Sequence, residues 1–131
     1  MHRIDRVVLA AAISWFGLWV HELHRVPGLF GFTPDGDLFM LPIAAALATW
    51  WVRSHSAAAL IALAAYGAIN LVGGVLSGLP LGWLPFVPEQ TAAHYLVHVV
   101  YASCQLPLLT LAAARIRAWP RGTEESSESV Q

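Results

Sequence analysis

Histidines are the residues of this chain whose type and spacing could do chemistry. His21 and His24 are spaced i, i+3, and His94 and His98 are spaced i, i+4, so each pair lies on one face if its segment is helical. Neutral imidazole is the commonest protein ligand for zinc, copper and iron. We therefore predict a transition-metal site (Cu, Zn or Fe) built from His21, His24, His94 and His98.

Further polar residues extend this predicted site. His94, His98, Tyr101 and Gln105 form one helical stripe, which cannot face lipid because lipid offers no hydrogen-bond partner. Nearby carboxylates could act as oxygen ligands or could orient an imidazole. The additional candidates are Glu22, Glu89, Asn70, Tyr101 and Gln105.

Other interpretations of the histidines stay open. One b-type haem needs a histidine from each of two facing helices, for example His21 with His94 or His98. The histidines could instead only hydrate the end of a bundle, or serve an oligomeric transporter for metal ions or protons. The segment at 21–25, HELHR, does not match the metalloprotease pattern H-E-x-x-H. No reaction can be named, so catalysis stays an open question.

Composition decides what kind of element must position these residues. Hydrophobic residues make up 57% of the 131 residues, charged residues make up 11%, and the mean hydropathy is +0.60. A soluble domain carries about 25% charged residues. The values indicate one integral membrane domain, and they exclude an ordinary soluble enzyme, a disordered protein and a nucleic-acid binder. The single cysteine, Cys104, excludes an intramolecular disulfide and a thiolate cluster.

Four apolar stretches approach the roughly 20 residues that one membrane span requires. We predict an all-α four-helix bundle, up-down-up-down, in a transmembrane domain at 1–119, with an apolar loop rich in Gly and Pro between the third and fourth helices. A polar, acidic tail at 120–131 is expected to be disordered in the cytoplasm. The predicted spans are about 7–25, 38–53, 57–77 and 91–116.

The arginines predict the orientation. Four spans leave Arg25 alone on one side and place the other six basic residues of the seven on the opposite side. The positive-inside rule then predicts a multi-pass protein of the cell membrane (an inner membrane, where there are two) with both termini in the cytoplasm. The four candidate metal ligands would lie on the extracytoplasmic side.

These patterns favour a function in metal handling or electron transfer at a histidine-rich site that holds a metal ion or one haem. The alternative is a non-catalytic accessory or assembly subunit of a larger membrane complex. The expected partners are the lipid bilayer and either other membrane subunits or further copies of the chain, with no nucleic acid.

Overall fold

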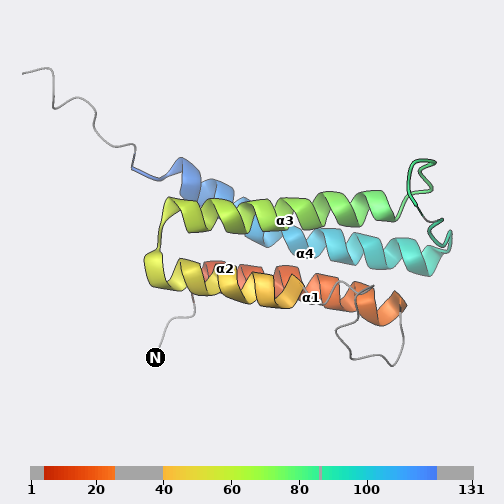
Figure 1. Ribbon diagram of the computed structural model, residues 1–131, viewed down its shortest axis with the longest axis horizontal. Helices are drawn as coiled ribbons and strands as arrows, with labels where there is room; N and C mark the ends of the chain where they lie inside the picture. The colour runs from red at the N-terminus through yellow and green to blue at the C-terminus, as the bar shows by residue number, and fades with distance from the viewer. Residues whose placement is uncertain (1–4, 26–39, 86, 121–131) are drawn as a thin grey trace, which may run out of the picture.

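The computed structural model describes residues 5–25, 40–85 and 87–120, although the side chains of residues 24 and 25 fall outside the description. The described part is all-helical. Its helices are α1 (Arg6–Arg25), α2 (Met40–Ser54), α3 (Ala57–Ser77) and α4 (Ala92–Arg117), which run side by side (Figure 1). The tail predicted to be disordered lies, beyond its first residue, outside the described residues, as does the whole link between α1 and α2 at 26–39.

Three of the four helices, α1, α3 and α4, are long and apolar enough to cross a membrane. Helix α2 has 15 residues, against 20, 21 and 26 for the others. The sequence predicted this span to be short, at about 38–53, and its first two residues lie outside the described residues. The prediction of α-helices at four positions is confirmed, whereas four complete membrane crossings remain a proposal.

Short polar side chains set the helix boundaries. Ser56 accepts a hydrogen bond from the backbone N–H of Ala59 (3.2 Å) and begins α3. Thr91 accepts one from His94 (3.2 Å) and begins α4. Such caps satisfy backbone donors that the first helical turn leaves over. Between α2 and α3 only two residues intervene, and His55 there adopts a positive φ of 44°, so the chain reverses sharply.

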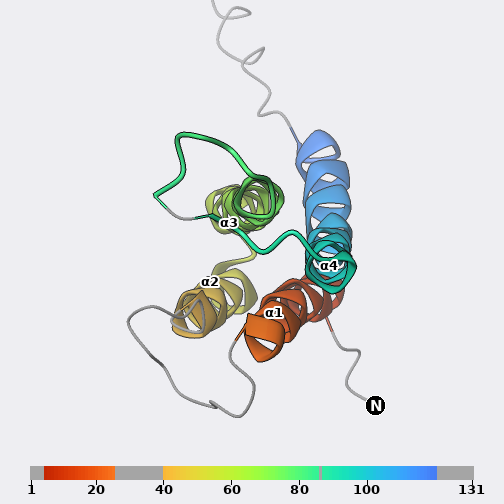
Figure 2. The ribbon, with the colours of Figure 1, turned by 90° about the vertical axis from the view of Figure 1, so that its right-hand side faces the viewer.

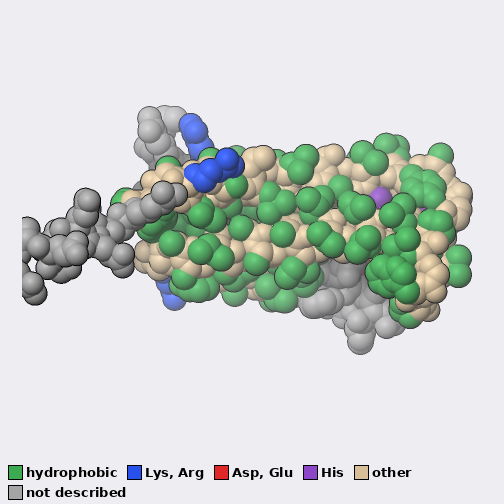
Figure 3. All heavy atoms as spheres, turned by 90° about the horizontal axis from the view of Figure 1, so that it is seen from above, with side chains coloured by type: hydrophobic (Ala, Val, Ile, Leu, Met, Phe, Trp, Pro, Cys, Tyr) green, Lys and Arg blue, Asp and Glu red, His purple; other side chains and the backbone are tan. Residues whose placement is uncertain are grey.

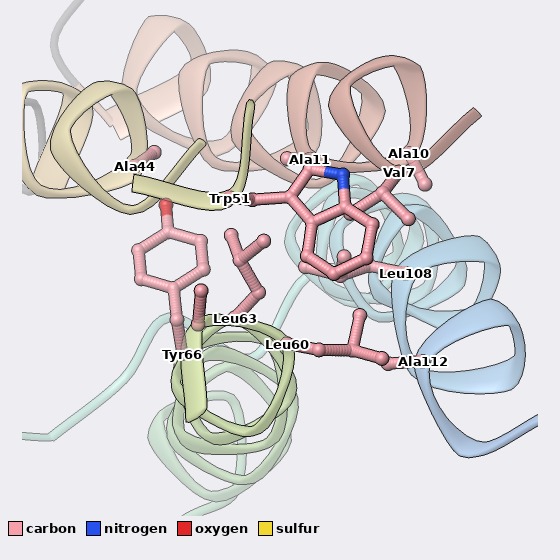
Figure 4. Close-up of a cluster of buried hydrophobic side chains, with 11 residues drawn as sticks. Val7, Ala10, Ala11, Ala44, Trp51, Leu60, Leu63, Tyr66, Leu108 and Ala112 are labelled. Atoms are coloured by element: carbon pink, nitrogen blue, oxygen red, sulfur yellow. The ribbon is translucent and has the colours of Figure 1, made fainter. Parts of the chain in front are cut away.

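Helix α4 packs most extensively against α1 and α3, while α2 contacts α3 and α1 (Figure 2). One cluster of apolar side chains fills the half of the bundle nearest to the ends of the described chain (Figure 4). Its members come from all four helices, and several have no solvent exposure at all. The fully buried members are Val7, Ala59, Leu60, Leu63, Leu108 and Ala112.

Trp51 joins three helices at that same end. Its indole N–H donates to Asp5 Oδ2 (3.0 Å), and the guanidinium of Arg115 lies 5.3 Å from the centre of its ring. Asp5 Oδ1 also accepts from the backbone N–H of Val7 (2.7 Å), which caps α1. We call Asp5, Trp51 and Arg115 the clasp.

The clasp changes the acidity of Asp5. Burial by itself raises the pKa of this carboxyl. The hydrogen bonds from Val7 and Trp51 and the positive charges of Arg115 and His55 outweigh burial, so the pKa of Asp5 lies below its ordinary value of 3.8.

Candidate metal-binding site

Three imidazoles from two helices meet at the end of the bundle opposite the clasp. The ring of His98 lies 4.7 Å from that of His21 on α1 and 4.4 Å from that of His94 on α4, measured between ring centres. Tyr101, one turn beyond His98, has its ring 5.5 Å from that of His21. The structure thus brings His21, His94 and His98 together; we call them the histidine cluster. In Figure 3 a histidine is visible toward one end, with arginines toward the other.

A close approach of α1 to α4 allows His21 to reach this cluster. Gly17 lies one turn before His21, and a Cβ placed on it would be 2.5 Å from the Cβ of Cys104 and 3.2 Å from the carbonyl oxygen of Tyr101. Any larger residue at position 17 would push the two helices apart. Small residues at helix contacts have this role in membrane bundles, where backbones approach closely.

Helix α3 holds His98 from the other side. The Nδ1 of His98 donates to the carbonyl oxygen of Gly74 (2.5 Å). A carbonyl can only accept, so Nδ1 carries the proton and Nε2 is the basic nitrogen of the neutral ring. A Cβ on Gly78 would lie 2.9 Å from Cγ of His98, and one on Gly74 would overlap the ring of Tyr101. Glycine at both positions therefore lets α3 seat the two rings.

Buried polar side chains continue from the cluster toward the middle of the bundle. Tyr101 donates to Asn70 Oδ1 (2.8 Å), and Asn70 Nδ2 donates to the carbonyl oxygen of Tyr66 (2.8 Å). Gln105 Nε2 donates to the carbonyl oxygens of Ser14 (3.1 Å) and Tyr101 (3.3 Å), while Ser14 Oγ donates to Gln105 Oε1. The polar stripe of α4 therefore faces protein, with partners on α1 and α3.

The remaining predicted residues lie in different places. Glu22 is buried, with 8% of its surface exposed, and follows His21 on α1. Glu89 is exposed in the segment that precedes α4. The side chain of His24 lies outside the described residues. His55 lies at the opposite end, where its ring contacts Trp51 (5.1 Å between ring centres).

The cluster does not have a metal-binding arrangement as it stands. Among the described residues, no group of three or more His, Cys, Asp or Glu side chains is placed to hold one ion. In the described residues the ring of His98 lies against the rings of His21 and His94. Metal binding by His21, His94 and His98 thus stays a prediction, and it requires the rings to turn.

A haem does not fit between His21 and His98. Axial imidazoles on opposite faces of one iron have ring centres about 6 Å apart, with the macrocycle between them. Here the centres are 4.7 Å apart and the rings touch. The close approaches at Gly17 and Gly74 keep α4 against both neighbours near this pair. A haem between His21 and His94 stays a prediction.

The chain matches no family model, no curated protein and no solved structure.

Two features of the site were missed in the sequence analysis. One is the Gly74 carbonyl that holds His98, and the other is the contact of Gly78 with the same ring. The four-residue spacing of these glycines is typical of close helix packing and could have indicated that α3 supports α4 here. No sequence signal identifies which backbone carbonyl accepts from a given side chain, because every residue carries one.

Proposed function

We propose that this chain is a membrane protein that binds one transition-metal ion (copper, zinc or iron) at the histidine cluster, for metal handling or electron transfer. One observation carries the proposal: the ring of His98 contacts the rings of both His21 and His94, which come from two helices, near one end of the bundle. Glu22, which follows His21 in the sequence and is buried, is the candidate for an oxygen ligand or for neutralising part of the charge of an ion.

The spacing of the rings suits a shared ion. Two imidazoles bound to one tetrahedral ion at about 2.0–2.1 Å have ring centres about 5 Å apart. The observed separations are 4.4 and 4.7 Å. The backbones therefore need little movement, and rotation about χ2, a soft torsion in histidine, can turn nitrogens toward one point.

The hydrogen bond from His98 to Gly74 supports the same proposal. Metal-bound histidines commonly donate their second ring N–H to a carbonyl or carboxylate, which fixes the tautomer and the ring orientation. His98 makes this kind of bond through Nδ1, which leaves Nε2 as the basic nitrogen of the ring. His98 is also the most buried of the three, which makes it the ligand whose loss water replaces least easily.

We further propose that the bundle crosses the cell membrane four times, up-down-up-down, with both termini in the cytoplasm. Arg6, Arg53, Arg115 and Arg117 lie at the clasp end of the helices, which supports this orientation under the positive-inside rule. The histidine cluster would then lie near the outer surface. Reporter fusions after residues 30, 55, 83 and 131 test the topology, and an extracytoplasmic signal at residue 55 would contradict it.

Metal titration of protein purified without a histidine tag tests the binding. Isothermal titration of the detergent-solubilised apoprotein with zinc or copper(II) should give one equivalent bound at pH 7. His98→Ala should weaken this binding by about tenfold or more, since it removes a buried ligand. His55→Ala is the matched control at the other end of the bundle and should bind like the wild type.

Protonation should compete with the ion. Histidine must be neutral to bind a metal, so affinity should fall as the pH drops below about 6. Absence of any affinity for zinc, copper or iron, or equal loss in the His98 and His55 variants, would reject the metal site. The accessory-subunit interpretation would then take first place, and co-purification of membrane partners would be its test.

A further inference from the structure

The buried side chains inside the bundle are polar in one half and largely apolar in the other. In the half that carries the histidine cluster, the buried side chains include Glu22, Asn70, His98 and Tyr101. Ser14 and Gln105, both buried and bonded to each other, are the last polar side chains of this series. Beyond them the described interior is apolar up to the clasp, apart from the buried hydroxyl of Tyr66.

The apolar half is closely filled. Leu60, Leu63 and Leu108 have no solvent exposure and pack together with Val7 and Ala112 (Figure 4). None of these side chains can coordinate an ion or bind a water molecule. An ion that passes through them would lose all of its ligands, at a cost of many kcal/mol for a bare charge. We call these five residues the plug.

The clasp closes the bundle beyond the plug. The hydrogen bond from Trp51 to Asp5 and the stacking of Arg115 on the indole ring hold α1, α2 and α4 together at that end. Trp51 is itself 2% exposed, so its ring covers the apolar side chains beneath it. Two successive layers thus separate the polar interior from the arginine-bearing end.

The other end of the polar interior is more open. His94 is only partly buried and lies in the first turn of α4. The residues that immediately precede and follow it, including Gln90 and Tyr95, are exposed. Burial increases from His94 to His98, one turn deeper. On α4, His94 is therefore the cluster residue nearer to the exposed start of the helix.

We infer that the histidine cluster is accessible from one side of the membrane only, through His94, and that the bundle receives and returns its ion on that side instead of conducting it across. The ion exchange rests on the proposed metal site, and the side of access rests on the proposed membrane topology. The partner that follows from this geometry is a water-borne supplier or acceptor of the ion on the extracytoplasmic side.

Cysteine accessibility tests the access without any metal. In a Cys104→Ala background, single cysteines replace His94, Leu108 of the plug and Ser54, which is exposed at the clasp end. Right-side-out and inverted vesicles are treated with a membrane-impermeant methanethiosulfonate. We expect His94→Cys to react only in right-side-out vesicles, Ser54→Cys only in inverted ones, and Leu108→Cys in neither. Leu63→Cys is a second plug position if Leu108→Cys does not fold.

Two results would overturn the inference: labelling at a plug position from either side, or labelling of His94→Cys in inverted vesicles or in neither preparation. Zinc uptake into proteoliposomes is the functional counterpart, and we expect none above that of protein-free liposomes. Flux through the wild-type protein would also overturn the inference. A protein that shows one-sided labelling but binds no metal would reject only the proposed metal binding.

Discussion

The buried tyrosines Tyr66 and Tyr101 differ in whether the hydroxyl makes a hydrogen bond, and an experiment can isolate this difference. The hydroxyl of Tyr101 donates to Asn70 across the contact between α4 and α3. The hydroxyl of Tyr66 is buried but has no hydrogen-bond partner in the part of the chain that the structure describes. Replacing each by phenylalanine removes the same single oxygen, so the two variants differ mainly in whether a bond is lost. We expect only Tyr101→Phe to destabilise the fold.

The expected magnitude follows from measurements on other membrane bundles. An interhelical hydrogen bond there contributes about 0.6 kcal/mol on average and about 1.7 kcal/mol at most. Tyr101→Phe also leaves Asn70 Oδ1 buried without this donor, which places the cost toward the upper part of that range. Tyr66→Phe removes a buried oxygen that gains nothing from a partner, so its effect should be near zero or slightly stabilising.

Unfolding by SDS in mixed micelles, followed by circular dichroism, measures both free energies. A double-mutant cycle of Tyr101→Phe with Asn70→Ala should give a coupling energy of about 0.6–1.7 kcal/mol. The control is the same cycle with Tyr66→Phe in place of Tyr101→Phe. Its coupling energy should be zero, because the Tyr66 hydroxyl does not bond to Asn70. Equal costs for the two tyrosine variants, or zero coupling between Tyr101 and Asn70, would refute the assignment of this bond.

Three more perturbations test the packing and the clasp. In the same SDS unfolding assay, Gly17→Ala should destabilise the bundle by about 1–3 kcal/mol, because the new Cβ would lie 2.5 Å from a Cβ on α4. The control is Gly73→Ala, whose new Cβ would have nothing within 4 Å and which should be neutral or stabilising. Leu63→Ala should cost about 2–5 kcal/mol through the cavity it leaves, and Leu96→Ala, at a position that is 63% exposed, should leave the unfolding free energy nearly unchanged. Asp5 has a folded-state pKa below 3.8, so its carboxylate stabilises the fold at neutral pH and this contribution is lost as the pH falls through the lowered pKa. The wild type should therefore unfold at a higher temperature than Asp5→Asn near pH 7, and this difference in unfolding temperature should shrink below pH 3.8. A difference that grows on acidification would contradict the lowered pKa of Asp5.

The helices could be predicted closely from the sequence because apolar runs and their breakers are local signals. The predicted spans at 57–77 and 91–116 correspond to α3 (Ala57–Ser77) and α4 (Ala92–Arg117). Ser56 and Thr91 cap these helices, and each belongs to the residue types that favour this position. The short second span could be seen as well, since Arg53 and the serines after it limit its length.

The contents of the site could be predicted only in part. Helical spacing alone places His94 and His98 on one face and indicates that this face avoids lipid. The ring orientations depend on χ2 angles set by tertiary contacts, which no sequence pattern encodes. The contact of His98 with Gly78 likewise depends on how α3 and α4 cross. Clustering of the histidines could thus be anticipated, whereas their ring-to-ring packing could not.

The unequal lengths of the helices have a consequence for the surrounding lipid. At about 1.5 Å per residue, the 15 residues of α2 extend about 22 Å, and the 26 residues of α4 extend about 39 Å. A hydrocarbon core is about 30 Å thick, so once inserted the protein would meet too little apolar helix on one flank and an excess on another. In that case lipid beside α2 would thin, while α4 would relieve its excess by tilting. The flank of α2 would therefore be the strained part of the perimeter, where a second helix gains most by displacing lipid.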